Sequence, residues 1–165
     1  ILSRPGATEV AVELNSLSKS FNMAGWRVGM LCGKAEIIQA VLKVKSNMDS
    51  GMFFGIQQGA IAALNLDVSW FESLNTIYSK RRKLVEKLAT KLGAKFDPKS
   101  VGLFVWAKLP KGVVDSETFI EKILQKQYVF ITPGTIFGSQ GEGYIRFSLC
   151  VPEATIEEAI KRFES

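Results

Sequence analysis

One amphipathic stretch near the middle of the chain constrains the fold more than any other feature. Apolar residues recur at helical spacing over 68–92 and form one continuous stripe. Asp67 precedes the stripe as a candidate N-cap, and Gly93 stands where a helix commonly ends. We therefore expect a single long helix that joins an amino-terminal part of the chain to a carboxyl-terminal part.

The apolar pattern differs on the two sides of this helix. Upstream it predicts two strands and two helices, whereas downstream it predicts a β-β-α-β-β-α order with helices on one face of a small sheet. The sequence therefore indicates an α/β chain. We expect strands at 10–14, 26–32, near residue 95, at 103–109, 129–132 and 144–150, and helices at 34–46, 56–64, 116–125 and from Pro152 onward.

Composition excludes several kinds of site. The 165 residues include no histidine, which excludes His-ligated zinc, Ser-His-Asp triads and Cys-His pairs. No apolar run reaches the roughly 20 residues of a membrane helix. The net charge is +5, but the one dense basic cluster, residues 80–83, lies in the long helix without interleaved aromatics. We interpret it as a solvated helix face and expect no nucleic-acid partner. Acid–base chemistry must use another residue type, and lysine is the obvious candidate.

The two cysteines lie far apart in the sequence, and each follows a strand-like apolar run. Cys32 and Cys150 make no disulfide framework, so we expect buried, reduced thiols in a cytoplasmic protein. The chain begins with Ile1 rather than Met and no signal peptide opens it. We therefore interpret the sequence as a fragment.

A hydroxyl-rich turn carries Lys19. Ser16 and Ser18 stand beside the lysine, and Arg27 is expected to return on the next strand and meet the same turn. Hydroxyls and a guanidinium fork together suit a phosphate group. A lysine amine beside them, kept neutral by partial burial and by the nearby arginine, could attack an aldehyde. Taken singly, such a lysine is usually solvated and such an arginine pairs with an acid, but the joint pattern favours a phosphorylated aldehyde.

The stretch SLSKSFNMAGWRVG, residues 16–29, resembles the pyridoxal 5′-phosphate attachment motif of class I and II aminotransferases, which have fold type I. The resemblance implies that Lys19 forms the Schiff base with the cofactor and then acts as the acid–base group of the proton transfer. It implies that Gly25 and Gly29 allow close backbone packing beneath the cofactor. It also implies that the cofactor phosphate is held by Ser16, Ser18 and Arg27.

A second arginine lies on the strand expected near the carboxyl end. Alternation places Arg146 opposite Ile145 and Phe147, and a half-buried arginine needs a carboxylate. From the residues alone, an ion pair with a protein acid and a ligand carboxylate both stay open. Family members carry a glycine-rich loop and then an R-x-S strand, so the resemblance implies that Arg146 binds the substrate α-carboxylate. Phe137 and Gly138 would shape the edge of the pocket.

Together the motifs imply the carboxyl-terminal half of a fold type I pyridoxal-phosphate-dependent transferase. Residues 1–66 would end the sheet of the large cofactor-binding domain, 67–92 would be the connecting helix, and 93–165 the small α+β domain. The implied activity moves an amino group between an amino acid and a 2-oxo acid, in a homodimer. Carbon–sulfur lyases share the motif, and a non-catalytic aminotransferase-like regulator is a third possibility.

Part of the family's catalytic apparatus is not identifiable in this sequence. Family members carry, upstream of the lysine motif, an aspartate for the pyridine nitrogen and a tyrosine and an asparagine for the ring oxygen. Asp49 and Asp67 follow the motif and are poor substitutes. We therefore expect this fragment alone to be inactive and to bind the cofactor weakly.

Overall fold

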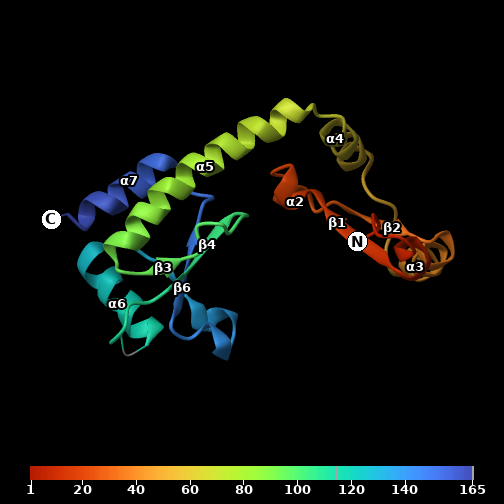
Figure 1. Cartoon of the computed structure of the whole chain (residues 1–165). Helices are drawn as coiled ribbons and strands as arrows, with labels where there is room; N and C mark the ends of the chain where they lie inside the picture. Colours follow the sequence, from red (N-terminus) through yellow and green to blue (C-terminus); the bar gives the residue numbers. More distant parts are fainter. Residues whose placement is uncertain (114, 165) are drawn as a thin grey trace. The chain divides into compact units, whose positions relative to one another are not determined.

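The computed structural model describes residues 1–113 and 115–164, and Figure 1 shows its helices and strands. Close contacts divide the chain into two compact units, Ile1–Phe71 and Glu72–Ser165. The helix α5 (Val68–Lys91) begins in the first unit and continues into the second. Each unit is described by itself.

The first unit is built on an antiparallel pair of strands, β1 (Val12–Ser16) and β2 (Gly29–Gly33). Its four core residues are Leu17, Met23, Val28 and Ala63. Around the hairpin lie α1 (Ala7–Val10), α2 (Leu17–Ser20), a 3-10 turn at Ala24–Trp26, α3 (Ala35–Met48) and α4 (Phe54–Leu64).

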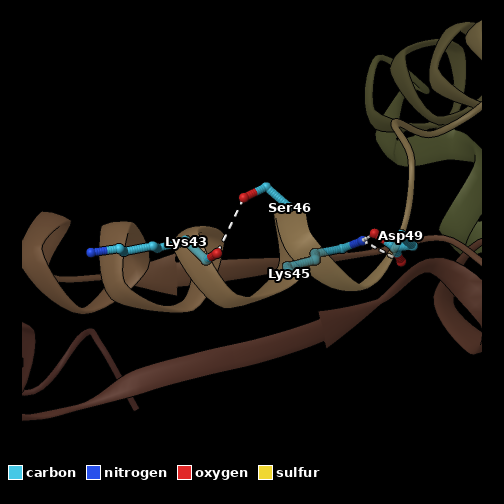
Figure 2. A network of polar contacts seen from close by, with 4 residues as sticks. All are labelled: Lys43, Lys45, Ser46 and Asp49. Atoms are coloured by element: carbon cyan, nitrogen blue, oxygen red, sulfur yellow. Dashed lines mark hydrogen bonds and ion pairs between the residues drawn. The ribbon is translucent and has the colours of Figure 1, made fainter.

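Helix α3 buries none of its residues within this unit. Its carboxyl end is stabilised locally, since Lys45 Nζ lies 2.7 and 2.8 Å from the two carboxylate oxygens of Asp49. Figure 2 shows this pair beside the Ser46 hydroxyl, which donates to the Lys43 carbonyl at 3.2 Å. Asp49 therefore caps the end of α3, and both of its carboxylate oxygens are bonded to Lys45.

The expected long helix and both of its ends are confirmed. Asp67 accepts a hydrogen bond from the Ser69 backbone N–H at 2.9 Å, as an N-terminal cap does. This bond holds the pKa of the Asp67 carboxyl below its ordinary value. Gly93 ends the helix with a φ of +70°, a conformation that glycine adopts at little cost.

The second unit is a four-stranded antiparallel sheet in the order β3-β4-β6-β5. Its strands are β3 (Lys95–Phe96), β4 (Phe104–Lys108), β5 (Thr132–Pro133) and β6 (Tyr144–Ser148). Helices α5, α6 (Ser116–Gln127) and α7 (Glu153–Arg162) pack on one face, as the apolar pattern predicted. The core contains apolar residues of these helices and the residues of the two central strands that face them. The strand residues are Val105, Ala107, Ile145 and Phe147.

Two predicted strands begin three residues later than expected. Residues 26–28 precede β2, because Trp26 closes the 3-10 turn and its ring packs where a side chain at Gly59 would stand. Residues 129–131 are not paired with β6. Their start is tied to α7 instead, since Arg162 Nη1 donates to the Tyr128 carbonyl at 3.1 Å.

The basic cluster at residues 80–83 is a solvated helix face only in part. Lys80 and Lys83 are exposed, but the two arginines between them are half-buried and partnered. Arg81 Nε pairs with Glu153 at 3.0 Å, and Arg82 Nη2 donates to the Gly102 carbonyl at 3.0 Å. The interpretation as a solvated face is therefore wrong for the arginines, which tie α5 to α7 and to the loop before β4.

Both cysteines are free, but the expected burial is wrong for Cys150. Alternation along β6 and just beyond it puts Leu149 in the core and leaves Cys150 exposed, while Cys32 is half-buried. Among the described residues, no helix combines the length and apolarity needed to cross a bilayer.

Candidate functional site

The lysine motif forms a single helical turn at the end of β1. The Ser16 hydroxyl caps α2 by accepting from the Ser18 N–H at 3.2 Å, and Leu17, 1% exposed, anchors the turn. Ser16, Ser18 and Lys19 thus share one turn, as predicted. Lys19 is exposed, so the expected partial burial is wrong for this chain by itself, because the turn directs only Leu17 into the core.

Arg27 reaches the same region through the backbone. Ser16 pairs with Gly29 across the hairpin, and the Leu17 N–H donates to the Val28 carbonyl at 3.2 Å. Arg27 precedes β2 with a φ of +53° instead of lying on it, so its expected place on the strand is wrong. Its Nη1 donates to the Ala24 carbonyl at 2.9 Å, and the structure records no bond from it to the serine hydroxyls.

The two glycines of the motif differ. A Cβ at Gly29 would lie 2.6 Å from the Asn15 carbonyl oxygen, so the two strands approach here as only glycine allows. A Cβ at Gly25 would meet no atom within 4 Å. The two strands therefore approach closely at Gly29, and the expected packing of both glycines beneath the cofactor stays a prediction.

These residues fit a phosphorylated aldehyde by their chemistry. Lys19 offers an accessible amine, and the hydroxyls of Ser16 and Ser18 retain hydrogens to donate. The bond to Ala24 uses one of the five N–H donors of Arg27, which leaves the others for phosphate oxygens. A phosphate and an aldehyde carbon could thus be held close to one turn.

Arg146 lies on the central strand β6, between Trp106 of β4 and Thr132 of β5 in register. It points away from the core, because its neighbours Ile145 and Phe147 are buried against the helices. Its Cζ lies 4.1 Å from the ring centroid of Phe104 and 4.1 Å from that of Phe137. Its Nε is buried and has no hydrogen-bond acceptor.

The protein supplies Arg146 with aromatic contacts and not with an anion. No carboxylate among the described residues forms an ion pair with it, so the structural ion pair left open by the sequence is not present there. Cation–π contacts offset part of the cost of burying a guanidinium, and they leave its in-plane N–H groups free. Those groups match a carboxylate in two-point geometry.

A pocket of about 370 Å³ lies at the β5 edge of the sheet, mainly on the face that the helices cover, since Val85 of α5 and Ile156 of α7 line it. This volume falls within the roughly 300–1,000 Å³ of ordinary small-molecule sites. Its wall is mainly apolar, with polar groups that include Thr132, Ser148 and Thr155. Arg146 lies in the wall of this pocket, but its guanidinium packs against Phe104 and Phe137 on the opposite face of the sheet, so the pocket is separate from the space in front of the guanidinium.

The loop before β6 holds Phe137 against Arg146. Gly134 and Gly141 touch so closely that a side chain at either would overlap the other's backbone. The Glu142 carboxylate accepts from the N–H and the hydroxyl of the fully buried Ser116, at 2.9 and 3.2 Å, which ties the loop to α6. Two residues around Arg146, Phe104 and Glu142, were not predicted from the sequence. The available signal for Phe104 was its place on the strand beside β6, where it faces the same way as Trp106, the residue paired with Arg146.

The chain belongs to the aminotransferase class I and II family, which matches residues 5–163. The predicted family is therefore confirmed.

Two curated relatives are LL-diaminopimelate aminotransferases. That of Oleidesulfovibrio alaskensis is 43% identical over 165 residues, all of this chain and 42% of the relative. That of Aquifex aeolicus is 39% identical, again over all of this chain and 42% of the relative. The chain thus spans less than half the length of these relatives.

Solved structures confirm the predicted fold. Apo-BacF from Bacillus subtilis superposes with a TM-score of 0.85 at 38% identity, over 97% of this chain and 41% of that one. An aromatic aminotransferase from Pyrococcus horikoshii gives a TM-score of 0.86 at 31% identity, over 98% of this chain and 44% of that one. The chain therefore has the α/β fold of part of a fold type I aminotransferase.

Proposed function

We propose that this chain works as the carboxyl-terminal part of an aminotransferase that moves an amino group between an amino acid and a 2-oxo acid. Membership of the family supports the reaction class. The observation that carries the proposal is Arg146, a half-buried guanidinium that is packed between two aromatic rings and has no carboxylate partner among the described residues. The substrates of such a reaction share a carboxylate next to the reacting carbon.

The lysine turn is the proposed site of pyridoxal 5′-phosphate. When bound, this cofactor supplies an aldehyde that condenses with amines and a ring that delocalises negative charge. Lys19 Nζ would bond to it and then accept and return the proton of the substrate Cα. Its phosphate would be bound by Ser16, Ser18 and Arg27, whose hydroxyl and guanidinium N–H groups donate to it.

Arg146 is the proposed substrate-binding residue. Its in-plane N–H groups would donate in pairs to the two oxygens of the α-carboxylate, which fixes the substrate in orientation as well as in place. The names of the relatives favour amino transfer over carbon–sulfur cleavage, and they make LL-diaminopimelate the first substrate to test. In the proposed enzyme, which is homodimeric and cytoplasmic, residues 1–66 belong to the large cofactor-binding domain. Residues 67–92 form the connecting helix, and residues 93–165 form the small domain.

Substitution of Arg146 tests the proposal in the full-length protein. Loss of one partner of a buried charge pair costs about 2–5 kcal/mol, so Arg146→Ala should raise KM for the amino acid about 30-fold or more. Cofactor absorbance should stay unchanged, because Arg146 is not assigned to the cofactor. Arg4→Ala, at an exposed position, is the control. An unchanged KM in Arg146→Ala would remove Arg146 from the site.

A further inference from the structure

Arg146 is held by aromatic rings and by no acidic side chain among the described residues. Phe104 and Phe137 both approach its Cζ to 4.1 Å, well within the roughly 6 Å at which cation–π attraction acts. The buried Nε has no acceptor. Nothing else recorded among the described residues, neither hydrogen bond nor ion pair, fixes the direction of this side chain.

The two rings are themselves fixed. Phe104 lies on β4 opposite Ser148, so the sheet sets its position. The ring of Phe137 meets Trp106 edge-on, with centroids 5.7 Å apart, and Trp106 stacks on Tyr144 at 5.6 Å. The tether from Glu142 to Ser116 holds the loop that carries Phe137. The guanidinium therefore rests on a rigid support.

We propose that Phe104 and Phe137 are positioning residues, which hold the Arg146 guanidinium in its binding orientation and leave its charge unneutralised for an incoming carboxylate. This rests on the proposed role of Arg146. Aromatic rings attract a cation through the negative face of their quadrupole, yet they offer no oxygen to its in-plane N–H groups. A protein carboxylate would orient the arginine equally well, but it would compete with the ligand for the same donors.

The orientation can be measured without any enzyme activity, in the 165-residue chain. The Nε–H signal of Arg146, identified by its loss in Arg146→Lys, should be shifted upfield by the two rings in a ¹⁵N–¹H spectrum. Phe137→Leu removes one ring and keeps an apolar side chain, and it should move the signal toward those of the other arginines. Phe137→Tyr keeps a ring and should keep the shift.

A second variant and a control keep the test valid if one of the substitutions prevents folding. Phe137 is 48% exposed, so Phe137→Leu carries the test even if Phe104→Leu does not fold. Phe130→Leu makes the same change at a 64% exposed ring for which no contact with Arg146 is recorded, and should leave the signal in place. An Nε–H signal that stays unmoved in folded Phe137→Leu would overturn the proposal.

Kinetics of the full-length enzyme separate positioning from a structural role. One cation–π contact is worth about 0.5–2 kcal/mol, so each leucine variant should raise KM about 2- to 30-fold with little change in kcat, and each tyrosine variant should restore it. If Arg146→Ala raises KM and the leucine variants do not, positioning fails and the carboxylate site stands. If Arg146→Ala leaves KM unchanged, the proposed function of Arg146 fails, and with it this proposal.

Discussion

The two units differ most in how much apolar surface they cover. Among the residues that the structure describes, the second unit closes a core of fifteen buried hydrophobic residues between a sheet and three helices, whereas the core of the first unit has only four. In the first unit, Leu14, Val44 and Phe53 are 84%, 61% and 74% exposed. The second unit thus encloses a core of its own, whereas the first unit leaves large apolar side chains exposed.

This difference follows from the same sequence rule applied in two settings. In β4 and β6, every second residue is apolar, and the helices of the second unit cover these residues to form a closed core. Helix α3 has an amphipathic sequence too, but no residue of it is buried. The amphipathic pattern therefore predicted where these elements form in both units, but not whether the apolar face of α3 would be covered.

Separating the units should give the largest effect. A polypeptide of residues 67–165, which keeps the Asp67 cap, should fold and unfold cooperatively, because its core lies within the second unit. Residues 1–66 alone should show neither a cooperative thermal transition nor dispersed amide signals, since four buried residues do not form a sufficient core. Circular dichroism and a ¹⁵N–¹H spectrum of each piece measure this, and equal cooperativity would refute the comparison.

Matched truncations on the antiparallel strands of the two units should give the next largest difference in stability. Ile145→Ala removes a side chain that is 0% exposed and should lower the free energy of unfolding by about 2–5 kcal/mol. Leu14→Ala, on the other antiparallel pair but 84% exposed, should change it by less than about 0.5 kcal/mol. Urea denaturation gives both values. A large loss from Leu14→Ala would show that the first unit has a tighter core than described.

Loss of the Glu142 tether should lower the free energy of unfolding by less than a core truncation but by more than a surface substitution. Glu142→Ala leaves the buried N–H and hydroxyl of Ser116 without their acceptor, which costs about 1–3 kcal/mol. Glu157→Ala, at an exposed position of α7, is the matched control and should be nearly neutral. Equal destabilisation by the two substitutions would show that the tether contributes nothing.

Acid should weaken the second unit gradually, the smallest effect. A backbone bond from Thr118 lowers the pKa of Asp115, and the bond to Lys91 lowers the pKa of Glu164. Because folding lowers these pKa values, the ionised forms contribute stability that is complete at neutral pH and is lost as the pH falls below about 4. Urea midpoints between pH 7 and pH 3 should decline, and by less in Asp115→Asn. A flat profile would contradict this assignment.

The sequence predicted the elements better than it predicted side-chain environments. Periodicity located α5 and both of its ends, because Asp67 and Gly93 act through local backbone geometry. It extended β2 to Trp26, because the packing of that ring on Gly59 joins residues far apart in sequence. Local sequence cannot report such contacts.

The same limit applies to the site. Alternation along the strand predicted which face of the sheet Arg146 lies on. It did not predict the contact with the Phe104 ring, because that contact depends on pairing between strands more than 40 residues apart in sequence. The exposure of Lys19 and the direction of the Arg27 side chain likewise depend on what surrounds the turn. The motif predicts which residues gather there and leaves their final contacts open.

The assignment of Lys19 is tested most directly by trapping its bond to the cofactor. The full-length protein is incubated with pyridoxal 5′-phosphate, reduced with borohydride, digested and sequenced by mass spectrometry. We expect a phosphopyridoxyl group on Lys19, in the peptide that contains Ser16 and Ser18, and we expect no such group in Lys19→Ala. A stoichiometric adduct on a different lysine, with Lys19 unmodified, would contradict it.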